Sequence, residues 1–227
     1  MEVAIIFTNI AKWILKKVKR LIVRFRNKQK VFVIGFNKTG TTSIQAALGE
    51  LGYILGDQAS AERLLKDVMQ NNYKPLLDYC CEGEAFQDVP FSIPGVYKVL
   101  DSNFKGSKFI LSVRNDSDQW FLSLLNFHKK VWTNGEALNE ENINKAKAVY
   151  KNYGSDFNKC VFGEVSYEPQ KYKKVYEEHI EAAKAHFKNR ADDFLVLNTA
   201  DETAYKKMTD FLGKKPKRDS FEWKNKT

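Results

Sequence analysis

The chain has 227 residues, of which 43% are hydrophobic and 13% aromatic, so it can bury a sizeable core and is not a disordered chain. Its 12 glycines and 5 prolines exclude a collagen-like or linker-like protein, and its length suits one domain with a short appendage. Three cysteines and three histidines, all scattered, give neither a disulfide framework nor the spacing of a zinc site. We therefore expect a reducing, cytoplasmic compartment and no metal.

The formal net charge of +9 is concentrated at the amino terminus. Residues 1–30 carry nine basic residues and one acidic residue, so the rest of the chain is nearly neutral. A nucleic-acid-binding domain usually carries its positive charge on a folded face. We therefore expect no nucleic-acid partner, and we assign the basic character to the amino-terminal segment.

Residues 1–29 form the first predicted segment, a basic amphipathic helix. Its apolar residues recur in steps of three and four, which places them on one helical face: Val3, Phe7, Ile10, Ile14, Val18, Leu21 and Phe25. This apolar run is too short to cross a bilayer, which needs about 20 residues. Such a helix can lie in the interface of an anionic membrane, making the protein peripheral. It can also pack on its own domain with a solvated basic face, and the sequence leaves both interpretations open.

Residues 30–227 read as one α/β domain. The β-branched and aromatic run from Lys30 to Gly35 is typical of a buried parallel strand. Further strands are predicted at 108–113 and 194–197, and residues 85–91 are predicted to form a short strand and its exit turn. Helices are predicted at 41–51, 59–70, 94–103, 118–130, 169–188 and 202–212, with a helical excursion or lid at 134–160. This alternation predicts a three-layer α/β/α domain with a mainly parallel sheet, similar to P-loop nucleotide-binding domains.

The most informative segment is G-F-N-K-T-G-T-T-S, which starts at Gly35 between the first strand and the first domain helix. Loop amides and a helix N-terminus there form an anion site, and Lys38 adds a full charge. The segment nearly matches the triphosphate loop G-x-x-x-x-G-K-[ST], but Thr41 stands where that loop has its lysine. The strand at 108–113 ends in Arg114, not in the aspartate that would support Mg²⁺. The loop therefore suits a phosphate-like anion bound without a metal, and a phosphosulfate fits that description.

Two motifs carry a family resemblance. The run K-T-G-T-T-S-I, from Lys38, resembles the 5′-phosphosulfate loop of sulfotransferases that use 3′-phosphoadenosine 5′-phosphosulfate (PAPS). The run F-I-L-S-V-R, from Phe109, resembles their 3′-phosphate segment, in which a strand ends in arginine and a serine follows on the next helix. Here these residues are Arg114 and Ser123, nine residues apart, one more than the common spacing. The resemblance covers about residues 31–227 and, in its bacterial-type branch, also includes G-D-Q at 56–58, A-F-Q-D-V-P-F at 85–91, Trp120 and the tail 221–227.

The resemblance implies in-line transfer of a sulfuryl group from PAPS to an acceptor hydroxyl or amine. Lys38 would neutralise charge on the bridging oxygen as the phosphate leaves. Arg114 and Ser123 would hold the 3′-phosphate, and tail residues 224–226 could close over it. The 5′-phosphate would be held by amides and hydroxyls of the loop and first helical turn: Thr39, Gly40, Thr41, Thr42 and Ser43.

Asp88 is the candidate base that takes the acceptor's proton. It follows the second predicted strand, where other sulfotransferases place a catalytic His or Glu. An ordinary aspartate is a weak base, so burial would have to raise its pKa. Alternatively, Asp88 caps the turn before Pro90 or orients Lys38. We expect His128 to lie at the surface or line the acceptor cleft, and His179 and His186 to lie at the surface.

The acceptor cannot be read from these motifs. The basic amino-terminal helix favours a membrane-proximal glycan or glycolipid, and a small metabolite remains open. We expect the segment 134–168 to shape acceptor choice. Two other function classes also remain open: a nucleotide kinase or triphosphatase with an atypical P-loop, and a non-catalytic, membrane-associated binding module.

Overall fold

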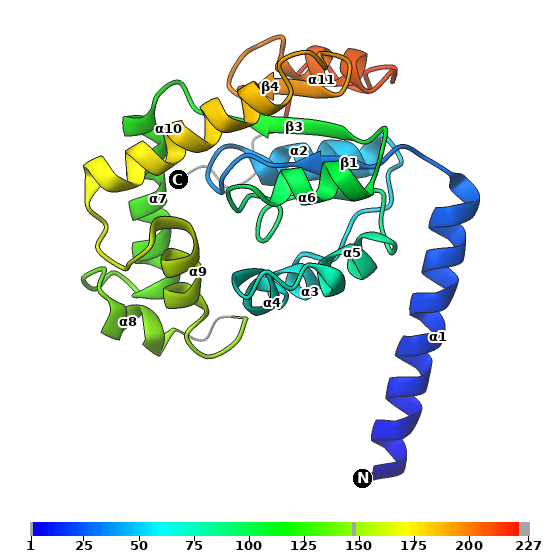
Figure 1. The fold of residues 1–227 in the computed structure, drawn as a ribbon, viewed down its shortest axis with the longest axis horizontal. Helices are drawn as coiled ribbons and strands as arrows, with labels where there is room; N and C mark the ends of the chain where they lie inside the picture. Colours follow the sequence, from blue (N-terminus) through cyan, green and yellow to red (C-terminus); the bar gives the residue numbers. More distant parts are fainter. Residues whose placement is uncertain (1, 147–148, 223–227) are drawn as a thin grey trace.

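The structure, a computed structural model, describes residues 2–146 and 149–222, with side chains from residue 14 onward. Its centre is a sheet of parallel strands in the order β2-β1-β3-β4 (Figure 1). Phe32 pairs with Phe86 on one side and Phe109 on the other, and its ring lies 5.5 Å from each of theirs. The strand bounds are β1 Val31–Val33, β2 Ala85–Phe86, β3 Lys108–Ser112 and β4 Phe194–Leu197.

Helices fill the intervals between the strands. Their bounds are α1 Glu2–Arg26, α2 Thr41–Glu50, α3 Gln58–Glu62, α4 Leu65–Met69, α5 Lys74–Cys80, α6 Val96–Asn103, α7 Ser117–Trp132, α8 Glu140–Lys145, α9 Tyr153–Phe162, α10 Pro169–His186 and α11 Ala204–Phe211. The helix predicted over 59–70 is two short helices, and α5 was not expected. The segment 85–91 holds the predicted short strand and its exit turn: the strand ends at Phe86, and Asp88 adopts a left-handed backbone (φ +60°) that turns the chain away.

The two faces of the sheet bury different helices. Val31 and Val33 point to the side covered by α2 and α11, while Phe32 and Ile34 point to the side covered by α6, α7 and α10. Alternate side chains of β1 therefore enter two separate cores. This arrangement confirms the predicted three-layer α/β/α architecture.

Two histidines expected at or near the surface are core residues. His179 is buried, donates from Nε2 to the Ile34 carbonyl oxygen at 2.8 Å and stacks on Phe36 with ring centres 4.7 Å apart. His128 is buried against Trp132, with ring centres 3.8 Å apart, and shares a 2.8 Å hydrogen bond with the Tyr167 hydroxyl. The surface placement was wrong because aromatic neighbours far away in sequence supply the burial.

The order of the strands locates the binding crevice. The connection after β1 leads to β2 at one side, and the next strand, β3, lies on the other side of β1. In parallel sheets ligands bind outside the carboxyl ends of the strands at such a switch point. Three residues that follow strand ends therefore lie at the carboxyl-terminal edge of the sheet: Lys38 after β1, Asp88 after β2 and Arg114 after β3.

Candidate active site

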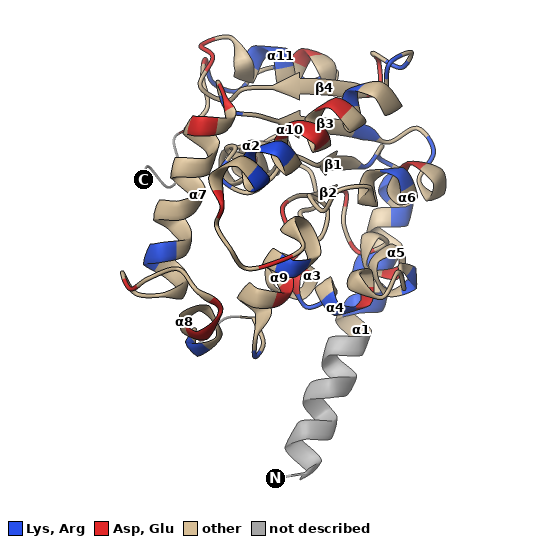
Figure 2. Cartoon of the chain, turned by 60° about the vertical axis from the view of Figure 1, so that its left-hand side comes forward, with Lys and Arg blue, Asp and Glu red and all other residues tan. Residues whose placement is uncertain are grey.

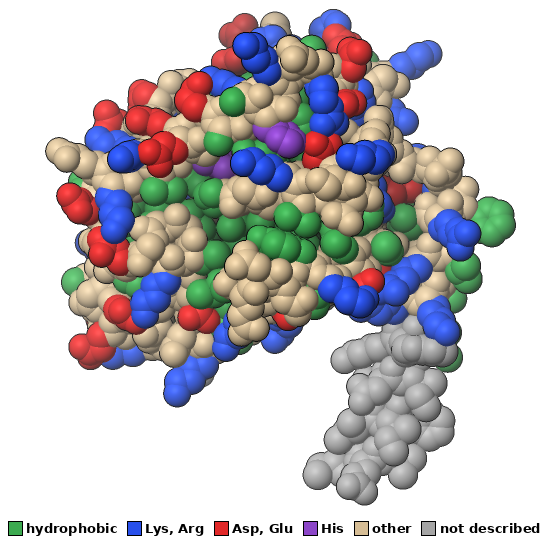
Figure 3. All heavy atoms as spheres, viewed as in Figure 1, with side chains coloured by type: hydrophobic (Ala, Val, Ile, Leu, Met, Phe, Trp, Pro, Cys, Tyr) green, Lys and Arg blue, Asp and Glu red, His purple; other side chains and the backbone are tan. Residues whose placement is uncertain are grey.

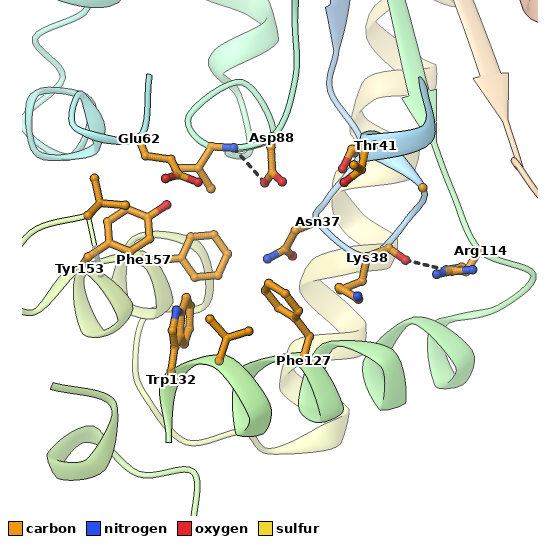
Figure 4. Close-up of a pocket in the computed structure, with 15 residues that line it drawn as sticks. Asn37, Lys38, Thr41, Glu62, Asp88, Arg114, Phe127, Trp132, Tyr153 and Phe157 are labelled. Atoms are coloured by element: carbon orange, nitrogen blue, oxygen red, sulfur yellow. Dashed lines mark hydrogen bonds between the residues drawn. The ribbon is translucent and has the colours of Figure 1, made fainter. Parts of the chain in front are cut away.

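A cleft of about 290 Å³ opens at this edge (Figure 4). One part of its wall is polar and comes from the loop after β1, the start of α2 and the ends of β2 and β3. The other part is mostly apolar and comes from α7, α9 and their surroundings. The lining residues are Asn37, Lys38, Gly40, Thr41, Thr42, Glu62, Asp88, Val89, Arg114, Phe127, Val131, Trp132, Val149, Tyr153 and Phe157.

The loop after β1 is held by groups from other elements. The Trp120 indole donates to the Asn37 carbonyl oxygen at 3.1 Å, and Nε of Arg114 donates to the Lys38 carbonyl oxygen at 2.5 Å. Lys38 itself has a left-handed backbone, with φ at +69°. Because both carbonyl groups are tied, the loop is fixed before any ligand binds.

Close packing requires a glycine in this loop. Gly40 has φ at +92°, and a Cβ atom there would lie 2.2 Å from Oγ1 of Thr199, beyond the end of β4. Thr39 is buried, its amide donates to the Phe36 carbonyl oxygen at 3.3 Å, and its hydroxyl bonds Phe36 and Oγ of Ser112. The Thr39 amide, which was expected to hold the 5′-phosphate, is thus already paired, and the Thr39 hydroxyl anchors the loop to β3.

The amino terminus of α2 faces the cleft. Thr41 and Thr42 both line it, and their amides belong to the first helical turn, which has no intrahelical acceptors. No side chain caps this end of the helix. Such an end favours an anion. Ser43 is buried and does not line the cleft.

Lys38 brings a desolvated positive charge to the same place. Its ammonium lies 4.5 Å from the centre of the Phe127 ring. Burial, followed by the neighbouring Arg114, lowers the pKa of Lys38, and Asp88 acts in the opposite direction. Across residues 14–146 and 149–222, no carboxylate lies within ion-pairing distance of this ammonium. The charge is therefore available to an incoming anion.

Asp88 is a carboxylate of altered basicity. Its side chain accepts a 3.0 Å hydrogen bond from the Val89 amide. Burial, and then the charge of Glu62, raises the pKa of Asp88 to about 6, although Val89 and Lys38 lower it. This is the direction that a base working near neutral pH needs. The expected burial effect on Asp88 is present, and the bond to Val89 shows that it also supports the turn.

Glu62 was not predicted as a site residue. It ends α3 and lines the cleft near Asp88 (Figure 4). Its carboxylate accepts a 3.2 Å hydrogen bond from Gln58. Burial raises its pKa as well. In the sequence it looked like an ordinary charged position on an amphipathic helix, so no local signal could have identified it.

The two residues assigned to the 3′-phosphate are placed differently. Arg114 lines the cleft and is half-buried, and burial lowers its pKa. Ser123 is not among the lining residues. It lies on the face of α7 that carries Trp120 and Phe127, because residues three and four apart share a helical face. Its hydroxyl is buried and finds no hydrogen-bond partner within the described chain, which is a costly state for a polar atom.

The apolar wall was predicted only as a region. From the segment 134–168, Val149, Tyr153 and Phe157 line the cleft, and α7 adds Phe127 and Trp132 (Figure 4). His128 does not line it, and burial lowers the pKa of that histidine to about 3, so it is neutral. Asp57 does not line the cleft and caps α3, accepting a 2.9 Å hydrogen bond from the Ser60 amide.

The two remaining expectations concern the carboxyl-terminal tail and a bound metal. The tail residues 224–226, expected to close over the 3′-phosphate, lie outside the described residues. Among the residues that are described, no group of three or more His, Cys, Asp or Glu side chains could hold a metal ion.

A fixed loop, an uncapped helix N-terminus, a desolvated lysine and a carboxylate of raised pKa lie together in one cleft of this α/β protein, and the first three favour an anion. Comparison of the sequence with models of protein families identifies the family to which the protein belongs. The family model for the sulfotransferase domain matches residues 30–227, so the chain belongs to the sulfotransferase domain family. Membership indicates a transferase of sulfuryl groups. No curated protein matches the chain significantly.

Proposed function

We propose that the protein transfers the sulfuryl group of PAPS to a hydroxyl or amine acceptor, with Asp88 as the general base. The observation that carries this proposal is the presence of Lys38 and Asp88 in one cleft, electrostatically coupled to each other. The lysine suits the departing phosphate, and the carboxylate suits the attacking group.

The donor fits the polar part of the cleft. The amides at the start of α2, with the Thr41 and Thr42 hydroxyls, would hold the 5′-phosphate. Arg114 offers a fork of donors for the 3′-phosphate. The buried, unpartnered Ser123 hydroxyl would gain there the acceptor that it lacks in the free protein.

The reaction is a substitution at sulfur. The acceptor oxygen or nitrogen forms a bond to sulfur while the bond from sulfur to the bridging phosphate oxygen breaks, and that oxygen keeps the electron pair. The acceptor's proton passes to Asp88. Lys38 stabilises the charge that develops on the bridging oxygen, so the protein works chiefly by positioning and electrostatics.

The apolar wall indicates the kind of acceptor. Phe127, Trp132, Tyr153 and Phe157 offer ring surfaces beside the two carboxylates. We infer an acceptor with a flat or apolar body next to its nucleophile, such as an aromatic alcohol or the apolar face of a sugar ring. A glycan, a glycolipid headgroup and a small metabolite each contain members of this class.

The test compares thermal unfolding of the protein alone, with adenosine 3′,5′-bisphosphate, and with ATP plus Mg²⁺. A ligand at 100 times its Kd stabilises by about 2.7 kcal/mol, which shifts Tm measurably. We expect a shift with the bisphosphate in the presence of EDTA, lost in Arg114→Ala and retained in the exposed-cation control Lys105→Ala.

Each other result has a distinct meaning. A shift with Mg²⁺–ATP alone would replace the proposal with a nucleotide kinase or triphosphatase. No shift with either ligand would favour a non-catalytic binding module. A bisphosphate shift that Arg114→Ala leaves intact would remove Arg114 from the 3′-phosphate site.

A further inference from the structure

The carboxyl-terminal half of α1 exposes an apolar face to solvent. Phe25 is 90% exposed and Leu15 67%, and the face holds more than half of the large apolar side chains exposed by residues 14–146 and 149–222. At about 100° per residue these side chains fall within an arc of about 120°. They are Ile14, Leu15, Val18, Leu21, Ile22 and Phe25.

The remaining surface of α1 is docked on the domain. Lys16 and Arg20 pair with Glu82 at 3.0 and 2.9 Å, just after α5, and Val23 is buried. Arg26 pairs at 2.6 Å with Glu84, whose side chain is fully buried. The described part of α1 lies beside α5 (Figures 1 and 2), where Arg20 also donates to the Asp78 carbonyl oxygen at 3.2 Å. The ion pairs thus fix the rotation of the helix with its apolar face outward.

Basic residues flank the apolar face on both edges. The same helical steps place Lys17 and Arg24 along one edge and Lys19 along the other, where Lys19 is half-buried and also acts on Asp57 of the domain. Figure 3 shows hydrophobic and basic side chains together where α1 meets the domain. An apolar centre with cationic edges suits a bilayer, because the centre enters the acyl boundary while the edges meet headgroup phosphates.

A second copy of the chain fits this face less well. Two such helices packed face to face would bring the basic edges of one beside those of the other, and residues 1–30 hold nine basic residues against one acid. The nearby acids Glu82 and Glu84 are already paired within the chain. We propose that α1 binds an anionic phospholipid surface through this face and holds the sulfotransferase domain at the membrane.

Vesicle co-sedimentation of the full chain tests the proposal. We expect binding to phosphatidylcholine vesicles containing phosphatidylserine, and weaker binding without it. Leu15→Ser combined with Phe25→Ser should weaken binding about tenfold or more. Lys17→Gln with Arg24→Gln should weaken binding about fivefold per charge, only on anionic vesicles. The matched control, Leu122→Ser, removes an exposed leucine on α7 and should change nothing.

Point substitutions are preferable to truncation, because removing α1 would also remove Arg26 and leave the buried Glu84 unpaired. The Leu15→Ser and Phe25→Ser pair, at exposed positions, should leave Tm and bisphosphate binding unchanged, which confirms folding. Absence of binding to phosphatidylserine vesicles, or equal loss in Leu122→Ser, would overturn the proposal. So would light scattering that shows a lipid-free dimer dissociated by the Leu15 and Phe25 pair, since the second copy would then be the occupant.

Discussion

The substitution Asp88→Asn should raise the stability of the protein and lower its activity. The ordinary pKa of this carboxyl is 3.8 and the folded value is about 6. Each pKa unit corresponds to about 1.4 kcal/mol, so ionised Asp88 costs the free protein up to about 3 kcal/mol. Asparagine carries no charge, can accept the Val89 hydrogen bond and tolerates a φ of +60°. We expect the variant to be more stable than the wild type at pH 7.5, with Tm higher by about 5–10 °C.

The sign of the pH dependence follows from proton uptake. Because the folded pKa is raised, the native state binds more protons than the unfolded chain between pH about 4 and 6. The contribution of Asp88 to the stability of the wild type therefore falls as pH rises through this window, and the advantage of Asp88→Asn should vanish below pH about 4. Asp57→Asn is the matched control, since hydrogen bonds from Ser60 lower the pKa of that carboxyl and its loss should bring no stabilisation.

The activity of the Asp88→Asn variant should fall although its stability rises. Asparagine cannot accept the acceptor's proton, so sulfuryl transfer from labelled PAPS to an apolar alcohol should fall by about 10²–10⁴. The wild-type rate should rise with pH through about 6 and drop about tenfold between pH 7 and 5. A variant that is less stable, or one that keeps most of the activity, would refute the base assignment and leave Asp88 as a turn-capping residue.

Three other predictions use the same assays. Burial raises the pKa of Asp88 most and the charge of Glu62 adds to it, so Glu62→Gln should shift the acid limb of the rate profile below pH 6. An unchanged limb would show that burial alone sets the pKa of Asp88. Gly40→Ala should lower Tm and bisphosphate affinity more than Gly106→Ala, because both have positive φ and only Gly40 would meet Thr199; equal effects would contradict the close-approach argument. Ser123→Ala should stabilise the free protein by about 1 kcal/mol and weaken bisphosphate binding about fivefold, and unaltered affinity would exclude Ser123 from the site.

The sequence was most informative where one short segment determines both structure and chemistry. The run from Lys30 to Thr42 contains a strand, a loop and a helix start, and each was predictable from local residue types. The edge on which Arg114 meets Lys38 was predictable too, because carboxyl ends of parallel strands share an edge. Thr39 shows the limit of this reasoning, since its pairing depends on Ser112, 73 residues away.

The acidic and aromatic parts of the cleft depend on contacts that no local pattern records. Glu62 reaches Asp88 because the predicted helix over 59–70 breaks into α3 and α4. Tyr153 and Phe157 reach the cleft because α9 packs beside α4 and α7. A carboxylate that acts as a general base near neutral pH needs a raised pKa. At Asp88 the pKa is raised by burial and by Glu62, which lies 26 residues earlier in the chain. The type of the base was therefore predictable from sequence, but the physical cause of its basicity was not.

The orientation of α1 likewise depends on contacts with residues far away in the sequence. The periodic pattern identified an apolar face and a basic remainder, and the domain-packed interpretation placed the basic face in solvent. The structure reverses this, because Glu82 and Glu84 attract Arg20 and Arg26 and leave Phe25 outside. Since Glu84 is buried within the domain, the helix cannot rotate without breaking that pair. The helix and the domain should therefore reorient together, so that a membrane holding α1 would also restrict the direction in which the cleft faces.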